Sequence, residues 1–224
     1  MYKGLYKGDG VYNGFLYNTK TVYNGGGGFP PLPPEYQALK YIECDLNTGA
    51  DAQIVGVSPS IAYDDTISLS CEFLQPIQGS NWLYFFYTWN QNERSFKLEG
   101  AGQRAYHRWN ATTTNEQQTF FSSGPLELIC SKSICKINGV YYPTNTGPAD
   151  SPKSLGRIFH FNIAQACRAY TFDVFDSDGN SKSHLVPAKR ISDGVLGFYD
   201  VIAGNFRRNV NNLNTGWIIP GPEL

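Results

Sequence analysis

The stretch "TISLSCEF", Thr66 to Phe73, decides the fold class. Apolar and polar residues alternate along it: Ile67, Leu69, Cys71 and Phe73 fall on one side, and Ser68, Ser70 and Glu72 fall on the other. Because successive side chains of a β-strand point to opposite faces, this alternation predicts a strand with one buried face.

Similar stretches continue along the chain, separated by turn residues at intervals of roughly ten residues, as in an all-β domain. They are "NWLYFFYTW" (81–89), "SFKLEG" (95–100), "RAYHRW" (104–109), "PLELIC" (125–130), "GRIFHFNI" (156–163), "RAYTFDVFD" (168–176), "SHLVPAKR" (183–190) and "GVLGFYD" (194–200). We therefore predict an all-β protein, either a β-sandwich or a jelly roll. Only residues 34–41 and 151–155 are candidates for short helices.

Three segments carry turn chemistry between these strands. Asn138-Gly139 separates two apolar runs and predicts a type I′ hairpin. "DSDGN", residues 176–180, reads as a hairpin turn. A calcium-binding loop would need its Gly two positions later and a Glu where Pro187 stands. Ser192-Asp193-Gly194 predicts another turn, and Asp200 is placed to cap the turn that follows.

The composition excludes several classes of protein. Aromatic residues make up 15% and charged residues 17%, and the net charge is −1. Without a basic block, nucleic acid is not expected as a partner. The chain has no apolar run long enough to cross a membrane and does not open on a signal pattern, so we expect synthesis in a cytosol.

The five cysteines do not form a metal-binding pattern. They are Cys44, Cys71, Cys130, Cys135 and Cys167, an odd number without a C-x-x-C pair. We interpret them as buried, reduced residues, with Cys130 and Cys135 able to face each other. The three histidines lie far apart in strand-like stretches. No metal and no cofactor is therefore expected.

Two longer stretches resemble a known family. "PPEYQALKYIECD" (33–45) and "HLVPAKRISDGVLGFYDVIAGNF" (184–206) are similar to the entry and closing segments of concanavalin A-like, laminin-G-like jelly-roll domains. In the second stretch the similarity is carried by Val186, Pro187, Arg190, Ser192, Asp193, Gly194, Gly197, Tyr199, Asp200, Gly204 and Phe206. Such domains are common in phage and prophage proteins of gut bacteria. The resemblance implies an antiparallel jelly-roll β-sandwich and a virion structural protein.

The N-terminal segment repeats a tyrosine-rich phrase at an offset of eleven residues. Each copy reads as a β-hairpin, with Tyr6 and Tyr12 in the first and Tyr17 and Tyr23 in the second. Two hairpins cannot bury a core alone, so they either pack on the body or pair with a partner protein. We predict an anchor at 1–25, a Gly/Pro linker at 26–35, a jelly-roll domain at 36–209 and a tail at 210–224.

Catalysis is not expected. Glu43 and Asp45 have the spacing of paired carboxylates on one face of a strand, but the third position that a laminarinase-like enzyme would fill with Glu is Thr48. The pair is therefore interpreted as structural.

Carbohydrate binding stays open. Sugars stack on exposed aromatic rings, and Trp89, Tyr106 and Trp109 are the aromatic candidates. Asn90, next to Trp89, is a polar candidate, and these residues lie near expected strand ends. Burial of the two tryptophans in the core is the alternative.

The sequence thus predicts a non-enzymatic phage virion protein, a fibre or decoration on the head or tail that docks through its N-terminal segment. Capsid, fibre or tail proteins are the expected partners, and a homo-oligomer is expected. Assembly takes place in the cytoplasm of the bacterial host. The alternative is an adhesin that recognises host surface glycans.

Overall fold

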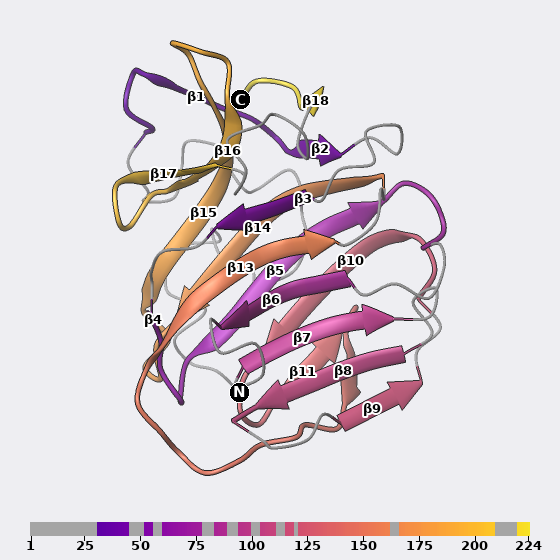
Figure 1. The fold of residues 1–224 in the computed structure, drawn as a ribbon. Coiled ribbons are helices and arrows are strands. Elements are labelled where there is room, and N and C mark those ends of the chain that lie inside the picture. The colour runs from indigo at the N-terminus through magenta and orange to yellow at the C-terminus, as the bar shows by residue number, and fades with distance from the viewer. Residues whose placement is uncertain are drawn as a thin grey trace.

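The structure is a computed structural model of the 224-residue chain. It describes residues 31–44, 52–55, 60–77, 83–88, 94–99, 104–110, 115–118, 121–161, 166–208 and 219–224. Within these ranges the regular structure is entirely β, and two antiparallel sheets face each other (Figure 1). The prediction of an all-β antiparallel sandwich is confirmed. The jelly-roll order of its strands stays a prediction.

The first nine strands are β1 (Tyr36–Ala38), β2 (Ile42–Cys44), β3 (Ala52–Val55), β4 (Ser60–Ile61), β5 (Thr66–Phe73), β6 (Leu83–Thr88), β7 (Arg94–Glu99), β8 (Arg104–Trp109) and β9 (Asn115–Gln118). The remaining strands are β10 (Gly124–Cys130), β11 (Cys135–Ile137), β12 (Val140–Tyr142), β13 (Lys153–Phe161), β14 (Cys167–Phe175), β15 (Ser181–Arg190), β16 (Leu196–Asp200), β17 (Asn205–Arg208) and β18 (Ile219–Pro220).

The larger, 11-stranded sheet runs β12-β11-β10-β5-β14-β15-β16-β17, with β1, β2 and β18 attached. The stretch that opened the analysis is its strand β5, which lies between β10 and β14. The smaller, 7-stranded sheet runs β3-β13-β6-β7-β8-β9, with β4 paired to β13.

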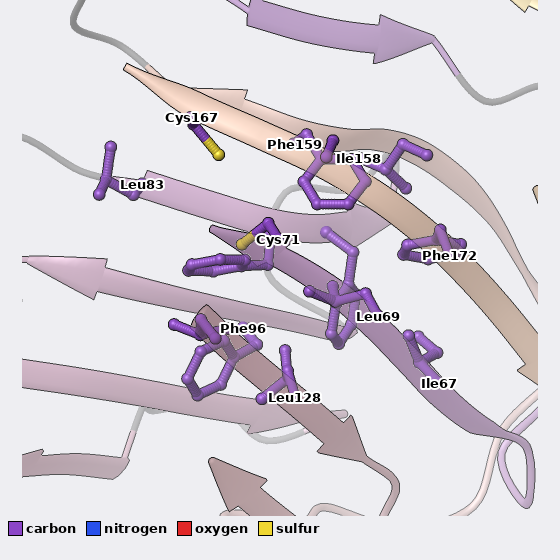
Figure 2. Packing of buried hydrophobic residues seen from close by; sticks show 14 of the residues in the cluster. Ile67, Leu69, Cys71, Leu83, Phe96, Leu128, Ile158, Phe159, Cys167 and Phe172 are labelled. Carbon is purple, nitrogen blue, oxygen red and sulfur yellow. The ribbon is translucent and has the colours of Figure 1, made fainter. Parts of the chain in front are cut away.

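The core fills the space between the two sheets. Figure 2 shows Leu69 and Phe172 from the larger sheet approaching Ile158 and Phe96 from the smaller one, and all four are fully buried. Each such side chain contributes about 1.5–3 kcal/mol when it leaves water. Ile67, Leu69, Cys71 and Phe73 of β5 are buried as the sequence predicted. Ser68 and Ser70 on the opposite face are buried as well, so β5 is covered on both faces there.

The turns follow the predicted chemistry. β11 and β12 form a hairpin in which Asn138 (φ 45°) and Gly139 (φ 84°) both have positive φ, as a type I′ turn requires. Asp176 Oδ1 accepts hydrogen bonds from the backbone N–H groups of Asp178 and Asn180. This Asx geometry joins β14 to β15, so the predicted hairpin turn is confirmed.

The closing motif also serves as turn punctuation. The Asp193 carboxylate accepts a hydrogen bond from Val195 N–H and is paired with Arg190. Asp200 Oδ1 accepts hydrogen bonds from the N–H groups of Ile202 and Ala203, which is the predicted cap.

A clasp joins the start of the body to the end of the chain. After β1 pairs with β15, the chain crosses to β2, which pairs with β14. The last six residues of the predicted tail run antiparallel to residues 38–43. Strand β18 pairs with β2, and further backbone hydrogen bonds follow, the last of them from Leu224 N–H to Ala38 O. In Figure 1, β1, β2 and β18 gather at one end of the sandwich with β16 and β17.

A second, smaller apolar cluster lies outside the main core. It contains Val186, Ala188, Tyr199 and Val201, and Leu32, Tyr36 and Phe206 pack against it. The Tyr36 ring lies 4.9 Å from the Tyr199 ring and 5.1 Å from the Phe206 ring between centroids. The chain just before β1 is therefore packed against the body.

The two helix candidates are wrong. Tyr36–Ala38 is strand β1, and residues 153–155 begin β13. Pairing with β15 in one case and with β4 and β6 in the other overrides the local preference.

Candidate functional site

A row of aromatic and basic side chains crosses the outer face of the 7-stranded sheet. The register places Tyr84 beside Lys97 and Lys97 beside Tyr106, on β6, β7 and β8. Lys97 Nζ lies 5.6 Å from the centroid of the Tyr84 ring and 4.4 Å from that of Tyr106. Both are cation–π distances, and only 5% of Lys97 is exposed, so the rings cover most of its stem.

A second row runs parallel to the first. Arg157 on β13 pairs with Tyr87, Tyr87 pairs with Ser95, and Ser95 pairs with Arg108. The two rows contact each other because the Tyr84 and Tyr87 rings meet edge to face at 5.2 Å. We call the outer surface formed by Tyr84, Tyr87, Lys97, Tyr106, Arg108 and Arg157 the tyrosine–basic face.

A β-bulge brings the two rows together. Tyr84 and Tyr87 are three residues apart, which in a regular strand would place them on opposite faces. The register between β6 and β7 shifts between Tyr84 and Phe86, and Phe85 and Phe86 are both fully buried. The bulge turns Tyr87 to the outer face, and bulges that redirect a side chain are frequent beside functional sites.

The neighbouring strand β13 is distorted at the same level. Ile158 pairs with Phe86 and His160 pairs with Tyr84, and Phe159 between them has φ 48°. A buried phenylalanine at positive φ is strained by about 1–3 kcal/mol. Packing against Phe172 and Phe198 holds it in place.

The electrostatics of the face keep its phenols neutral. Burial raises the pKa of Tyr84, to which Tyr87 and Glu99 add, while Arg108 lowers it. Burial also raises the pKa of Tyr87, which Arg157 lowers. Both hydroxyls are therefore protonated at neutral pH and can donate hydrogen bonds. Cations, ring surfaces and hydroxyl donors can together bind a polar, ring-shaped ligand.

Tyr106 and Trp109 were both predicted as ligand-binding residues. Tyr106 lies on this face, whereas Trp109 does not. Trp109 is fully buried, so it has no ring surface for a sugar, and its placement at a ligand site is wrong. The alternation along β8 points Ala105, His107 and Trp109 toward the core. Trp109 Nε1–H donates to Tyr63 O at 2.9 Å. Its backbone N–H donates a hydrogen bond to Asn145 O, and its backbone oxygen accepts one from Gly147 N–H.

A buried polar network surrounds Trp109. His107 stacks on it at 6.1 Å with an interplanar angle of 3°. Asn145 N–H donates to His107 Nδ1, so the proton lies on Nε2, which donates to Ser131 O. Burial lowers the pKa of His107 to about 4. The fully buried Arg94 adds hydrogen bonds to Ile61 O and a salt bridge to Asp150.

The remaining predicted site residues lie outside the described residues. They are Tyr6, Tyr12, Tyr17 and Tyr23 of the predicted anchor, and Trp89 and Asn90 of the candidate glycan site. Asp45 and Thr48, which belong to the carboxylate argument, also lie outside them.

Glu43 lies on the outer face of the 11-stranded sheet, in a charge ladder across three strands. The register aligns Glu43, Arg168 and Glu72 on β2, β14 and β5. Arg168 Nε donates to Glu43 Oε2 at 2.7 Å, and its Nη1 atom lies 3.5 Å from Glu72 Oε2. Tyr170 Oη donates to Glu72 at 2.7 Å. Both carboxylates are therefore hydrogen-bonded or paired within the sheet.

The five cysteines gather in two places, which the sequence showed only in part. Cys130 and Cys135 are direct partners across β10 and β11, as expected. Cys44 and Cys167 are partners across β2 and β14, and Cys71 lies on β5, the strand beside β14. Burial raises the pKa of Cys44, Cys71 and Cys130, which disfavours their reactive thiolates.

Two further observations concern the described ranges alone. No group of three or more His, Cys, Asp or Glu side chains gathers there in a way that could hold a metal ion. No helix in them is long and apolar enough to span a membrane.

No family model matches the chain, and neither a curated protein nor a solved structure matches it.

Proposed function

We propose that the chain is a non-enzymatic component of a bacteriophage particle, a β-sandwich displayed on the head or tail and docked through its N-terminal segment. The observation that supports this is the packing of residues 32–38 onto the body. Leu32 and Tyr36 cover the second apolar cluster, and β1 joins β15 in the sheet. A partner that holds residues 1–25 is therefore coupled directly to a stable sandwich.

The proposed partners are capsid, fibre or tail proteins, and the particle is the proposed location. A structural role suits the carboxylate ladder, since Glu43 and Glu72 are both occupied by Arg168. Homo-oligomerisation belongs to the same proposal, because fibres and decorations are built from repeated copies.

The test uses the full chain with its four anchor tyrosines, Tyr6, Tyr12, Tyr17 and Tyr23, replaced together by serine. We expect this variant to unfold at the same temperature as the wild type but to be missing from purified particles. The matched control is Tyr141→Ser, because Tyr141 is 70% exposed on the edge strand β12. Immunogold labelling with antibody against the body measures incorporation. Unlabelled wild-type particles, or normal incorporation of the quadruple variant, would contradict the proposal.

The second candidate function is glycan binding, and the tyrosine–basic face favours it. Tyr84 and Tyr106 are half-buried and flank Lys97, so ring edges and hydroxyls are presented together. Binding to a glycan array should be lost in Tyr106→Ala and retained in Tyr141→Ala. An array without any signal from the wild type would leave plain decoration as the function.

A further inference from the structure

The strand register of the larger sheet places four of the five cysteines directly opposite another cysteine. Cys130 faces Cys135 across β10 and β11, and Cys44 faces Cys167 across β2 and β14. All five cysteines are free thiols in the structure. We propose that the two facing pairs are sites of oxidative modification, at which the folded protein forms the cross-strand disulfides Cys130–Cys135 and Cys44–Cys167. Cys71 then remains the free thiol.

The hydrogen bonds of the β10–β11 hairpin define the spacing of the first pair. Ser131 N–H donates to Ile134 O at 2.8 Å, so these two residues occupy a hydrogen-bonded position of the ladder. Positions alternate along an antiparallel pair, which makes Cys130 and Cys135 a non-hydrogen-bonded position with Cα atoms about 4.5 Å apart. A disulfide requires a Cα separation of about 4.4–6.8 Å. Both side chains lie on the core face, where they are fully buried.

The register also selects the partner of Cys167. Its direct partner is Cys44, and direct partners in an antiparallel sheet have Cα atoms about 4.5–5.5 Å apart, which suits a disulfide at either kind of position. Cys71 lies on β5, on the other side of β14, where its direct partner is Ala169. It is thus a diagonal neighbour of Cys167, and such neighbours are about 7–8 Å apart. Figure 2 shows Cys71 and Cys167 on these adjacent strands.

Oxidation of a buried pair requires local opening, and each pair has one cysteine near the margin of the sheet. Cys135 lies on β11, which is followed only by the edge strand β12, where Val140 is 56% and Tyr141 70% exposed. The Lys136 Nζ atom, 5.1 Å from the centroid of the Tyr141 ring, covers that hairpin from outside. Cys44 lies on the three-residue strand β2, whose outer neighbour is the two-residue strand β18. Short marginal strands open more readily than the centre of a sheet.

The proposed reaction is thiol–disulfide exchange with a small disulfide such as oxidised glutathione. In the opened hairpin, Cys135 loses its proton and its thiolate attacks the glutathione disulfide, which forms a mixed disulfide and releases one glutathione thiolate. After closure, Cys130 loses its proton and attacks the Cys135 sulfur, and the second glutathione thiolate leaves. The two cysteines lose two electrons, and the two glutathiones gain the electrons and the two protons. Cys44 and Cys167 react in the same way.

The second step limits the rate of this exchange. Burial raises the pKa of Cys130, so little of its thiol is ionised at neutral pH, and the reaction should be faster at pH 8.5 than at pH 7. Slow exchange and a reducing cytosol keep the newly made protein in its thiol form. Only the place of oxidation rests on the proposed function, because a particle released from a cell meets an oxidising medium.

The experiment incubates purified full-length protein with oxidised glutathione at pH 8.5. The product is alkylated with iodoacetamide in denaturant, and the labels are counted by intact mass. The untreated protein should carry five labels, and the oxidised protein should carry a single label that peptide mapping places on Cys71. Its unfolding temperature should rise by about 10 °C, mainly because Cys44–Cys167 closes a loop of about 120 residues.

The matched variants are Cys167→Ala and Cys71→Ala, which each remove one buried thiol from neighbouring strands. Each variant is compared with its own reduced form, so the cost of the substitution itself cancels. The rise in unfolding temperature on oxidation should be largely lost in Cys167→Ala and kept in Cys71→Ala.

Three results would overturn the proposal. Five labels after prolonged incubation, both in buffer and in urea just below the unfolding transition, would show that neither pair can form a bridge. A linked peptide that joins Cys71 to Cys167 would overturn the second pair, and a stable glutathione adduct on Cys135 would overturn the first. Absence of the protein from phage particles would overturn the proposed function and leave the thiol count unchanged.

Discussion

The outer faces of the two sheets both set a cation against a tyrosine ring, and they hold it in different ways. On the larger sheet, the Arg168 guanidinium carbon lies 4.6 Å from the centroid of the Tyr41 ring. On the smaller sheet, Lys97 Nζ lies 4.4 Å from that of Tyr106. Arg168 also has a carboxylate register neighbour on each side, Glu43 and Glu72, whereas Lys97 has the tyrosines Tyr84 and Tyr106.

The difference is that a carboxylate compensates the charge of Arg168. Glu43 neutralises Arg168, and this hydrogen bond is the main reason why the pKa of Arg168 is raised. Tyrosine rings, unlike a carboxylate, stabilise a cation without cancelling its charge. The cation–tyrosine contact thus has different register neighbours on each sheet.

The largest expected effect comes from the inward side of the smaller sheet, where His107 is kept neutral. Its pKa is lowered to about 4 by burial, against about 6.5 in the unfolded chain. Between these values the unfolded state binds a proton that the folded state does not. The free energy of unfolding should therefore fall by about 3 kcal/mol as the pH falls from 6.5 to 4.

Urea unfolding at pH 7.5 and pH 4.5 measures this effect against His107→Gln. The variant lacks the titrating ring, so it should lose less stability over the same interval than the wild type. Equal losses in both proteins would show that His107 does not titrate as its burial requires.

The next effect concerns the ladder. Arg168→Met leaves Glu43 and Glu72 without the cation that both contact, so we expect a loss of about 1–2 kcal/mol. High salt should reduce the loss, because it already screens the attraction in the wild type. The control is Lys189→Met, whose partner Glu223 lies 3.4 Å away and is 63% exposed. It should cost about 0.5 kcal/mol or less. Identical costs for the two variants would remove the structural role of the ladder.

Local sequence pattern was enough for the strands and turns. The alternation from Thr66 to Phe73 gave β5 with its buried face, and Asn138-Gly139 gave the hairpin turn. The first depends on side-chain alternation and the second on tolerance of positive φ. Both rules can be read from one short segment of the sequence.

Long-range pairing was beyond the sequence. Glu43 and Arg168 are 125 residues apart, and nothing in either segment indicates that β2 pairs with β14. The bulge that turns Tyr87 outward depends equally on the partner strands. One signal was present but unused: Tyr106 and Trp109, three residues apart on a regular strand, cannot share a face, so only one of them could meet a ligand.

Glu127 sharpens the comparison because it is a carboxyl group of the larger sheet that lies outside the ladder. Burial raises its pKa to about 7, and Lys136 opposes the shift. Between pH 4.5 and 7 the folded state binds more protons than the unfolded state, so the free energy of unfolding falls as the pH rises. Glu127→Gln should gain about 1 kcal/mol at pH 8, after a discount for partial exposure, and should gain nothing at pH 4.5. A gain independent of pH in urea unfolding would argue against this titration.

The smallest expected effect on stability belongs to Lys97, and it tests the comparison most directly. In Lys97→Met the unbranched side chain still fills the space between Tyr84 and Tyr106, and its sulfur can contact the rings. The cation–π attraction is lost, so the free energy of unfolding should fall by about 1 kcal/mol or less. Lys136→Met, which removes the same type of contact on the other sheet, should cost about as little. Thermal unfolding of both variants beside the wild type measures the difference. A loss of about 3 kcal/mol for Lys97→Met alone would mean that its charge is held by a buried ion pair, and the distinction between the two faces would not stand.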